Sequence, residues 1–314
     1  MREILDRFFD APAEFGRTDA VVVRHHNEIV VERYGSGLDA STTLRSWSMA
    51  KSMLHAAVGI LVSEGSLDVD ARADVAEWEA DDDPRRAISL RHLLTMRAGL
   101  QWVEGDIIKG QLPDSVTMMY GNNKGPMHDT AAWAANRRLA DAPGSAFNYS
   151  SGSSMLLSRI VRDVVGSGSR YEQWLRQRFF EPTGMMSAKP RFDAAGTWLA
   201  SSFCFATAAD FSAFGQLYLD GGMANGVRVL PTSWTDTAAV ATGHGDDGKI
   251  HTMHWWRFGD ADSGAFQAVG YQGQHIVVVP SADLVVVRLG ETPEDHRHHV
   301  GDALRDLVDA YAVR

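Results

Sequence analysis

The sequence predicts an α+β fold, an α/β sandwich in which both chain ends form one antiparallel sheet with covering helices around an inserted, mostly helical region. Two observations support this prediction. Strand-like runs rich in Val and Ile occur near the N-terminus and in the final third, whereas helical spacing of apolar residues prevails from about 66 to 200. We therefore expect a discontinuous sheet-plus-helix domain (1–66 and 205–314), a helical domain (67–204) and an active site in the cleft between them.

The first elements expected are a helix at 1–10, strands at 20–24 and 28–32, and a longer helix at 48–64. The residues between the two strands, His25, His26 and Asn27, are typical of a hairpin turn. The longer helix has apolar residues at positions 50, 54, 57, 58 and 61, which is helical spacing, and Gly65 ends it.

Further helices are expected at 89–96, 151–165, 169–182 and 207–219, with a long surface loop over 101–128. Several Gly, two Pro and two adjacent Asn indicate that loop. Ser169 and Glu172 have the spacing of a capping box that opens the third of these helices. Strands are then expected at 251–258, 265–271, 275–279 and 284–289, and a helix from about 296 to 312 closes the chain.

The composition excludes several classes of protein. The 314 residues carry 30 Lys and Arg against 40 Asp and Glu, a formal net charge of −10, which argues against nucleic acid as a partner. No run of about 18 uninterrupted apolar residues occurs, so neither a spanning helix nor a membrane partner is expected. Acidic residues follow Met1 almost at once, without the apolar segment of a signal peptide, and this favours a cytoplasmic location.

The sequence contains few features that would indicate a metal site or a redox centre. Cys204 is the only cysteine, which excludes an internal disulfide, a Cys-rich zinc site and a CxxC pair. His296, His298 and His299 form the densest histidine group, which we interpret as a surface cluster at a helix start. The sequence contains no G-x-S-x-G, H-E-x-x-H or P-loop motif. We expect no metal site.

Ser48, Met49, Ala50 and Lys51 form an S-x-x-K motif at the start of the 48–64 helix. Residues i and i+3 lie one turn apart on one helix face, so the Lys51 amine can reach the Ser48 hydroxyl. A desolvated lysine has a lowered pKa and can accept the proton of a serine nucleophile, and the N–H groups at a helix start suit an oxyanion. The alternative is an exposed lysine one turn from a helix cap.

Two further segments carry candidate groups. Tyr149 lies in a turn that leads into a helix, where its phenol could shuttle a proton to a leaving group; alternatively its ring packs under the turn. Residues 270–274 precede a strand, and their glycines allow close approach of a ligand, with the Gln274 N–H as an oxyanion donor. A simple turn with a bulge is the alternative there.

In order and spacing these segments resemble the penicillin-recognising serine hydrolases, which include serine β-lactamases, D-alanyl-D-alanine peptidases and related esterases. The resemblance implies a β-lactamase/transpeptidase-like fold. It covers about residues 20 to 312 and is carried by 47–52, 91–96, 99–100, 147–152, 211–217 and 284–290. Within this superfamily the chain looks most like the 6-aminohexanoate-dimer hydrolase-like branch of esterases and amidases, through residues 114–149 and through Gly273 and Gln274.

The resemblance implies a serine hydrolase that forms an acyl-enzyme on Ser48, hydrolyses small esters or amides and needs no cofactor. Lys51 and Tyr149 would manage the proton, and the N–H groups of Ser48 and Gln274 would bind the oxyanion. The expected substrate-binding residues are Ser151, Tyr271, Gly273, Trp102, Asp114, Tyr120 and Trp255.

Two departures from the family pattern bear on the substrate. Ser151 stands where true penicillin-recognising enzymes usually have Asn, and Tyr271, Gln272 and Gly273 stand where they usually have Lys-Thr-Gly. The absence of that lysine argues against β-lactams and other substrates that bear a carboxylate. Tyr271 suits a substrate with a neutral or apolar acyl group. A true β-lactamase or D-Ala-D-Ala peptidase is the alternative, followed by a non-catalytic binding protein of the same fold.

Overall fold

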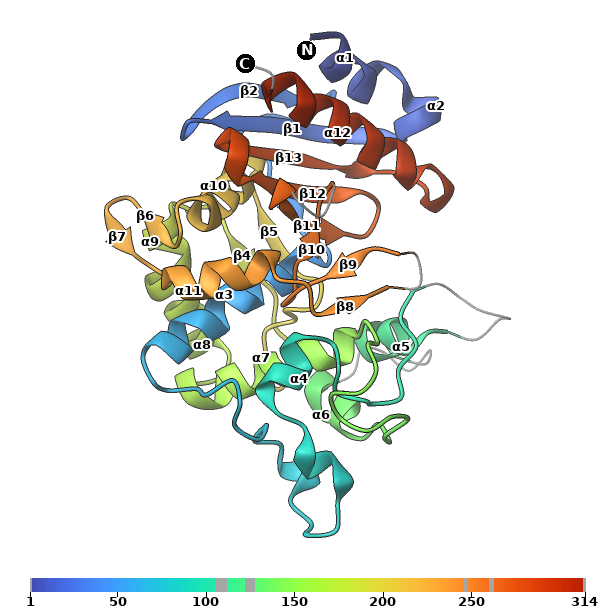
Figure 1. Cartoon of the computed structure of the whole chain (residues 1–314), viewed down its shortest axis with the longest axis vertical. Coiled ribbons are helices and arrows are strands. Elements are labelled where there is room, and N and C mark those ends of the chain that lie inside the picture. Colours follow the sequence, from blue (N-terminus) through green and yellow to red (C-terminus); the bar gives the residue numbers. More distant parts are fainter. Residues whose placement is uncertain (1, 106–111, 122–127, 246–247, 260–262, 313–314) are drawn as a thin grey trace.

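The computed structural model describes residues 2–105, 112–121, 128–245, 248–259 and 263–312. Within these ranges the main element is an eight-stranded sheet in the order β2-β1-β13-β12-β11-β10-β9-β8 (Figure 1). The strands are β1 (Arg17–His25), β2 (Glu28–Tyr34), β8 (Gly243–His244), β9 (Ile250–His251), β10 (Trp256–Arg257), β11 (Phe266–Gly270), β12 (Gln274–Val279) and β13 (Leu284–Glu291). All neighbours pair antiparallel, so strands from both chain ends form one sheet, as predicted.

Helices cover both faces of this sheet (Figure 1). One face carries α1 (Arg2–Asp10), α2 (Pro12–Phe15) and α12 (Arg297–Ala312), and the other carries α3 (Met49–Ser63) and α10 (Ala208–Leu219). Side chains alternate between the faces of a strand, so Val21 and Val23 join the core under α12 while Ala20 and Val22 join the core around α3. Burial on both faces explains why the centre of β1, residues 20–23, is a continuous apolar run rather than an alternating one.

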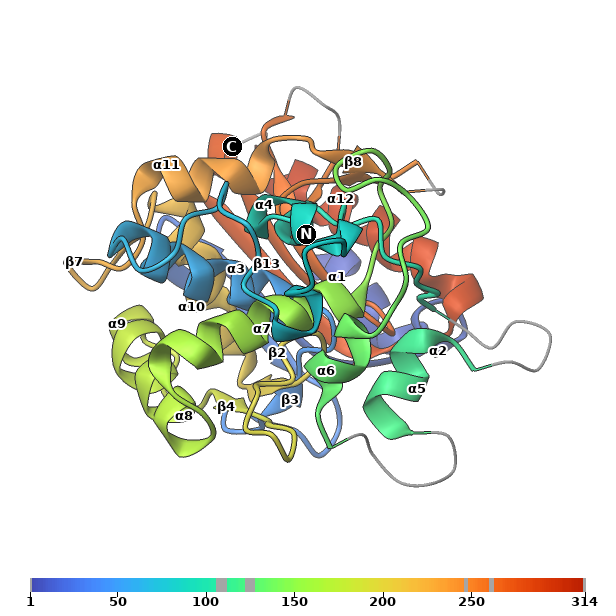
Figure 2. The same ribbon diagram turned by 90° about the horizontal axis from the view of Figure 1, so that it is seen from below.

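The chain between β2 and β8 is mostly helical, and α7 packs against α3, α4 and α6 (Figure 2). Its helices are η1 (Ala76–Trp78), η2 (Pro84–Ala87), α4 (Leu90–Leu94), α5 (Asp114–Tyr120), α6 (Thr130–Ala135), α7 (Ser151–Val165), α8 (Ser169–Leu175), η3 (Arg176–Phe180), α9 (Glu181–Thr183), α11 (Thr232–Thr235) and η4 (Asp236–Ala239). Short strands form two small sheets, β3 (Leu44–Arg45) with β5 (Cys204–Ala206) and β4 (Lys189–Pro190), and β6 (Met223–Ala224) with β7 (Val227–Arg228). Two short 3₁₀ helices, η6 (Pro280–Ala282) and η7 (Glu294–His296), flank β13.

Three local predictions are wrong. The strand expected at 251–258 is broken, because the chain turns between β9 and β10 where His254 adopts a left-handed φ of 61°. A buried turn and a buried strand are equally apolar, so the pattern could not separate them. The capping box does not form, since Gly168 is the N-cap residue of α8 and makes no side-chain cap. The expected loop over 101–128 contains α5, and residues 106–111 and 122–127 of that prediction lie outside the described residues.

Arg288 of β13 is fully buried and joins the N-terminal segment to the turn before β12. Its guanidinium donates to the carbonyl oxygens of Gly273 at 2.9 Å and Gln272 at 3.3 Å. It also donates to two carbonyl oxygens and one hydroxyl of residues 15–18. Burial lowers the pKa of Arg288 to about 10, so the group stays charged at neutral pH.

We expect Arg288→Met to lower the free energy of unfolding by about 3 kcal/mol or more, because several buried oxygens lose their donor together. Urea unfolding followed by circular dichroism measures this loss. Arg228→Met is the matched control, since Arg228 also donates to carbonyl oxygens but lies exposed on β7. Equal unfolding midpoints for the Arg288 variant and the wild type would contradict this structural role.

Candidate active site

The segment before α3 places Ser48. The Ser46 N–H donates to Cys204 O at 2.9 Å, and the Ser46 hydroxyl accepts from the Cys204 N–H at 3.1 Å. Trp47 then adopts a left-handed φ of 46°, which is uncommon for a bulky residue and is found where the surrounding structure imposes it. Helix α3 begins at Met49 with Ser48 as its N-cap residue, yet the Ser48 side chain makes no capping hydrogen bond. Its hydroxyl is therefore available to another partner.

Lys51 provides that partner one turn further along α3. Its Nζ lies 3.0 Å from Ser48 Oγ, and it also donates to Ser151 Oγ at 3.0 Å and to Ser201 O at 2.8 Å. The residue is 1% exposed, which excludes the alternative of a lysine exposed to solvent. Burial lowers the pKa of Lys51 to about 8, against the opposing effect of the Glu104 charge. A usable fraction of the lysine is therefore a neutral amine near neutral pH.

Tyr149 stands in the turn that leads into α7. The Nζ atom of Lys51 lies 5.0 Å from the centroid of its ring. Burial and then the Glu104 charge raise the pKa of the Tyr149 phenol, and its interaction with the Ser48 side chain opposes them. The phenol is therefore protonated at neutral pH, which makes it a proton donor rather than a base in the resting site.

Aromatic rings surround Tyr149. The centroid of the Trp256 ring lies 5.3 Å from that of Tyr149, and the His251 centroid lies 6.1 Å away. Phe147 contacts both Trp256 and His251. The sequence does not predict Trp256 or His251 as site residues, because they lie on either side of the unrecognised break between β9 and β10.

The prediction that Trp255 lines the pocket is wrong. Its side chain is fully buried in the core, with its ring centroid 5.5 Å from that of Phe214 and 5.2 Å from that of Phe266. Neighbouring residues of extended chain point in opposite directions, so the adjacent Trp256 takes the position near Tyr149.

Glu104 belongs to the site, although the sequence does not identify it. Its Oε1 accepts from the Ser151 hydroxyl at 2.6 Å, and its Oε2 accepts from the Ser151 N–H at 2.8 Å and from Trp102 Nε1–H at 2.6 Å. The Trp102 ring packs so closely on α7 that a Cβ at Gly152 would lie 2.5 Å from it. Because Glu104 and Ser151 are 47 positions apart and share no motif, no sequence pattern connects them.

The turn before β12 lies beside Ser48. A Cβ at Gly270 would lie 2.5 Å from Ser46 O, so β11 ends directly against the segment that carries the serine. The Tyr271 ring meets the Trp47 ring edge-on, with centroids 5.3 Å apart. The chain then reverses within two residues and β12 begins at Gln274. The segment proposed to supply an oxyanion donor is thus next to the S-x-x-K helix.

A cation lies beside Tyr271 even though the family's lysine is absent from the turn. The Arg297 guanidinium carbon is 4.5 Å from the centroid of the Tyr271 ring. Arg297 Nη1 is also 3.8 Å from a Glu294 carboxylate oxygen. Its charge is therefore shared with a carboxylate and stacked on a ring, unlike that of a free lysine.

The other predicted pocket residues near α5 have structural contacts. Asp114 Oδ2 accepts from the Val103 N–H at 2.8 Å, and Oδ1 is 3.4 Å from Arg137 Nη1. Trp102 is buried, whereas Tyr120 at the end of α5 is 50% exposed. Contact of Asp114, Trp102 and Tyr120 with a substrate stays a prediction.

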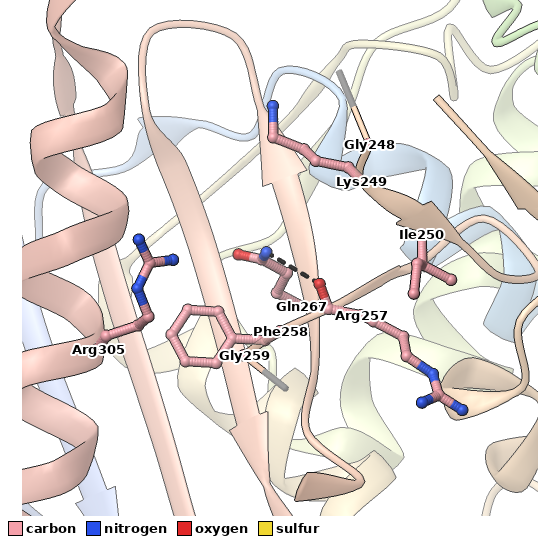
Figure 3. A pocket seen from close by; sticks show the side chains of 8 residues that line it. All are labelled: Gly248, Lys249, Ile250, Arg257, Phe258, Gly259, Gln267 and Arg305. Carbon is pink, nitrogen blue, oxygen red and sulfur yellow. Dashed lines mark hydrogen bonds between the residues drawn. The ribbon is translucent and has the colours of Figure 1, made fainter. Parts of the chain in front are cut away.

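A separate surface hollow is lined by residues of β9, β10, β11, α12 and the chain next to these strands, among them Lys249, Arg257, Gln267 and Arg305 (Figure 3). Neither Ser48 nor its partners line this hollow. Among the described residues, no set of three or more His, Cys, Asp and Glu side chains is arranged to hold a metal ion. In the same residues, no helix has the length and apolar character needed to cross a membrane.

Comparisons with known proteins identify the family and the fold. The Beta-lactamase family model matches residues 5–310. The 6-aminohexanoate-dimer hydrolase of Paenarthrobacter ureafaciens is 26% identical over 313 residues, which cover 93% of this chain and 77% of that protein. The solved structure "Putative 6-aminohexanoate-dimer hydrolase from Bacillus anthracis" is 27% identical and superposes with a TM-score of 0.80, covering 98% of this chain and 81% of that one.

A family VIII carboxylesterase shows the same fold, with a TM-score of 0.69 at 16% identity over 96% of each chain. The predicted β-lactamase/transpeptidase-like fold and the resemblance to 6-aminohexanoate-dimer hydrolase-like proteins are both confirmed. The chain belongs to the beta-lactamase family and is a hydrolase related to 6-aminohexanoate-dimer hydrolase.

Proposed function

We propose that the protein is a serine hydrolase that forms an acyl-enzyme on Ser48 and hydrolyses small esters or amides. The observation that carries this proposal is the buried Lys51, whose Nζ lies 3.0 Å from Ser48 Oγ. A serine hydroxyl is a weak nucleophile until a neighbouring base takes its proton. Burial depresses the pKa of Lys51 enough for the amine to act as that base.

In the acylation step Ser48 Oγ attacks the substrate carbonyl carbon while its proton passes to the Lys51 amine. The N–H groups of Ser48 and Gln274 stabilise the oxyanion; within the described part of the chain the Ser48 N–H has no backbone acceptor. The proton passes through the Tyr149 phenol to the leaving alcohol or amine. Water then attacks the ester carbonyl carbon and gives a proton to Lys51, and Lys51 returns that proton to Ser48 Oγ as the acid leaves.

The surroundings of Ser48 favour a neutral or weakly charged acyl group. Trp47, Tyr149, Tyr271 and Trp256 supply aromatic surface near the serine, and the turn before β12 carries no lysine. The name of the Paenarthrobacter relative describes cleavage of an amide, which supports amides beside esters as substrates. A true β-lactamase is the second candidate, since the family bears that name.

A substrate panel tests this proposal. We expect p-nitrophenyl esters or short anilides to be turned over with kcat/KM about 10-fold or more above that of nitrocefin, because a substrate carboxylate lacks a dedicated ammonium partner. Initial rates are measured for graded acyl lengths, and Ser48→Ala corrects for uncatalysed hydrolysis. A kcat/KM for nitrocefin above that of every ester and amide would favour the β-lactamase instead.

A further inference from the structure

Glu104 determines which groups donate and which accept in the hydrogen bonds around Lys51. An ionised carboxylate only accepts hydrogen bonds, so the Ser151 hydroxyl, 2.6 Å from Glu104 Oε1, must donate its single proton to it. Ser151 Oγ can then only accept from Lys51 Nζ at 3.0 Å. The Ser201 carbonyl oxygen, 2.8 Å from the same Nζ, also only accepts.

This direction determines where the lone pair of a neutral Lys51 points. A neutral amine has two N–H donors and one lone pair. The two donors are used by Ser151 Oγ and Ser201 O, and the remaining neighbour within hydrogen-bond distance is Ser48 Oγ at 3.0 Å. The lone pair is thus directed at the Ser48 O–H, which is the arrangement that a general base needs.

We propose that Glu104 is a positioning residue of the active site: by taking the proton of Ser151 it makes the neutral Lys51 amine accept from Ser48. This inference rests on the proposed role of Ser48 and Lys51. Glu104 contacts neither Ser48 nor the reacting atoms, and it acts through Ser151. Its own position is fixed by the Trp102 indole N–H and the Ser151 N–H, which both donate to Oε2.

The other titratable groups near Lys51 carry no negative charge and therefore do not act on Lys51 as Glu104 does. Within the described part of the chain, those that interact with it are Tyr149, His251 and His254 besides Glu104. Burial raises the pKa of Tyr149 and lowers the pKa values of both histidines, that of His254 to about 3, so all three are neutral near pH 7. Glu104 is the member of this set that carries a negative charge.

The Glu104→Gln substitution reverses the hydrogen bonds from residue 104 to Ser151 and from Ser151 to Lys51, while the side chain at position 104 keeps nearly the same shape. An amide has one acceptor oxygen, and the two N–H donors at Oε2 favour placing it there. The NH₂ group then donates to Ser151 Oγ, whose proton turns towards Lys51 and takes its lone pair. Loss of the charge also lowers the pKa of Lys51, since Glu104 raises it.

The test is the rate at which a fluorophosphonate modifies Ser48, followed by intact mass across a range of pH. For Glu104→Gln we expect a plateau rate about 10-fold or more below wild type, with the rise of the rate shifted to lower pH. Glu104→Asp should recover part of the rate, because it restores the charge and the acceptor. Glu77→Gln is the matched control: it removes a carboxylate that pairs with Arg159 of α7, and we expect wild-type rate and profile.

Ser151→Ala gives a second route to the same test. If Glu104 acts through the Ser151 hydroxyl, adding Glu104→Gln to Ser151→Ala should cost less than about 3-fold in plateau rate, so the two effects are not additive. A Glu104→Gln enzyme with the wild-type plateau and pH profile would overturn the inference, and so would losses that multiply in the double variant. If wild-type Ser48 is not modified at all, the proposed function has failed instead.

Discussion

Replacing Ser48 by Ala should lower kcat on the best ester or amide substrate by about 10⁴-fold or more, because no acyl-enzyme can form without the hydroxyl. The substitution removes one oxygen that is hydrogen-bonded to Lys51 and that does not cap α3. We therefore expect the fold to persist, with an unfolding free energy within about 1 kcal/mol of wild type. Steady-state kinetics and urea unfolding of the same preparation measure both quantities.

Ser63→Ala is the control for this substitution. Ser63 ends the same helix, and its hydroxyl donates to Ile60 O at 2.7 Å, far along α3 from Lys51. We expect this variant to keep wild-type kcat and KM. Turnover by Ser48→Ala at a rate comparable to wild type would show that another group performs the chemistry.

The second large effect is expected at Lys51. As a base the lysine must be neutral, and burial lowers its pKa to about 8. The value of kcat/KM should therefore rise with pH while the protonated fraction falls, and should level off above about pH 8. Lys51→Met should lower kcat by about 10³-fold and abolish this rise, because no titrating base remains beside Ser48.

Lys189→Met is the control for charge, since Lys189 lies exposed on β4. It should retain both the rate and the pH profile of wild type. Lys51→Arg should be as inactive as Lys51→Met, because a guanidinium stays protonated and cannot accept the serine proton. A flat profile from pH 6 to 9 in the wild type would contradict the assignment of Lys51 as the base.

Much of the fold follows from local sequence patterns. Helix α7 has the predicted bounds, 151–165, because Ser150 caps it at one end and Gly166 ends it at the other. The hairpin of β1 and β2 was expected at its observed turn, where His26 and Asn27 adopt left-handed φ values. Such elements depend on residues that are close in sequence, so local sequence patterns predict them.

The S-x-x-K helix is predictable for the same reason, whereas the hydrogen-bond partners of Lys51 outside this helix do not follow from local patterns. Ser151, 100 positions away, is expected only from the family resemblance, and Ser201, 150 positions away, is not predicted at all. Contacts of this kind arise when separate elements pack together, and they leave no periodic pattern in the chain. Glu104 in its loop and Trp256 after a buried turn become visible only in the folded structure.

The proposed mechanism depends most directly on an activated Ser48. Intact mass spectrometry after incubation with a fluorophosphonate tests this, with wild type and Ser48→Ala treated in parallel. We predict one adduct on the wild type, located on the peptide that carries Ser48, and none on the variant. An unmodified, fully folded wild type, or an equal adduct on Ser48→Ala, would contradict a nucleophilic role for this serine.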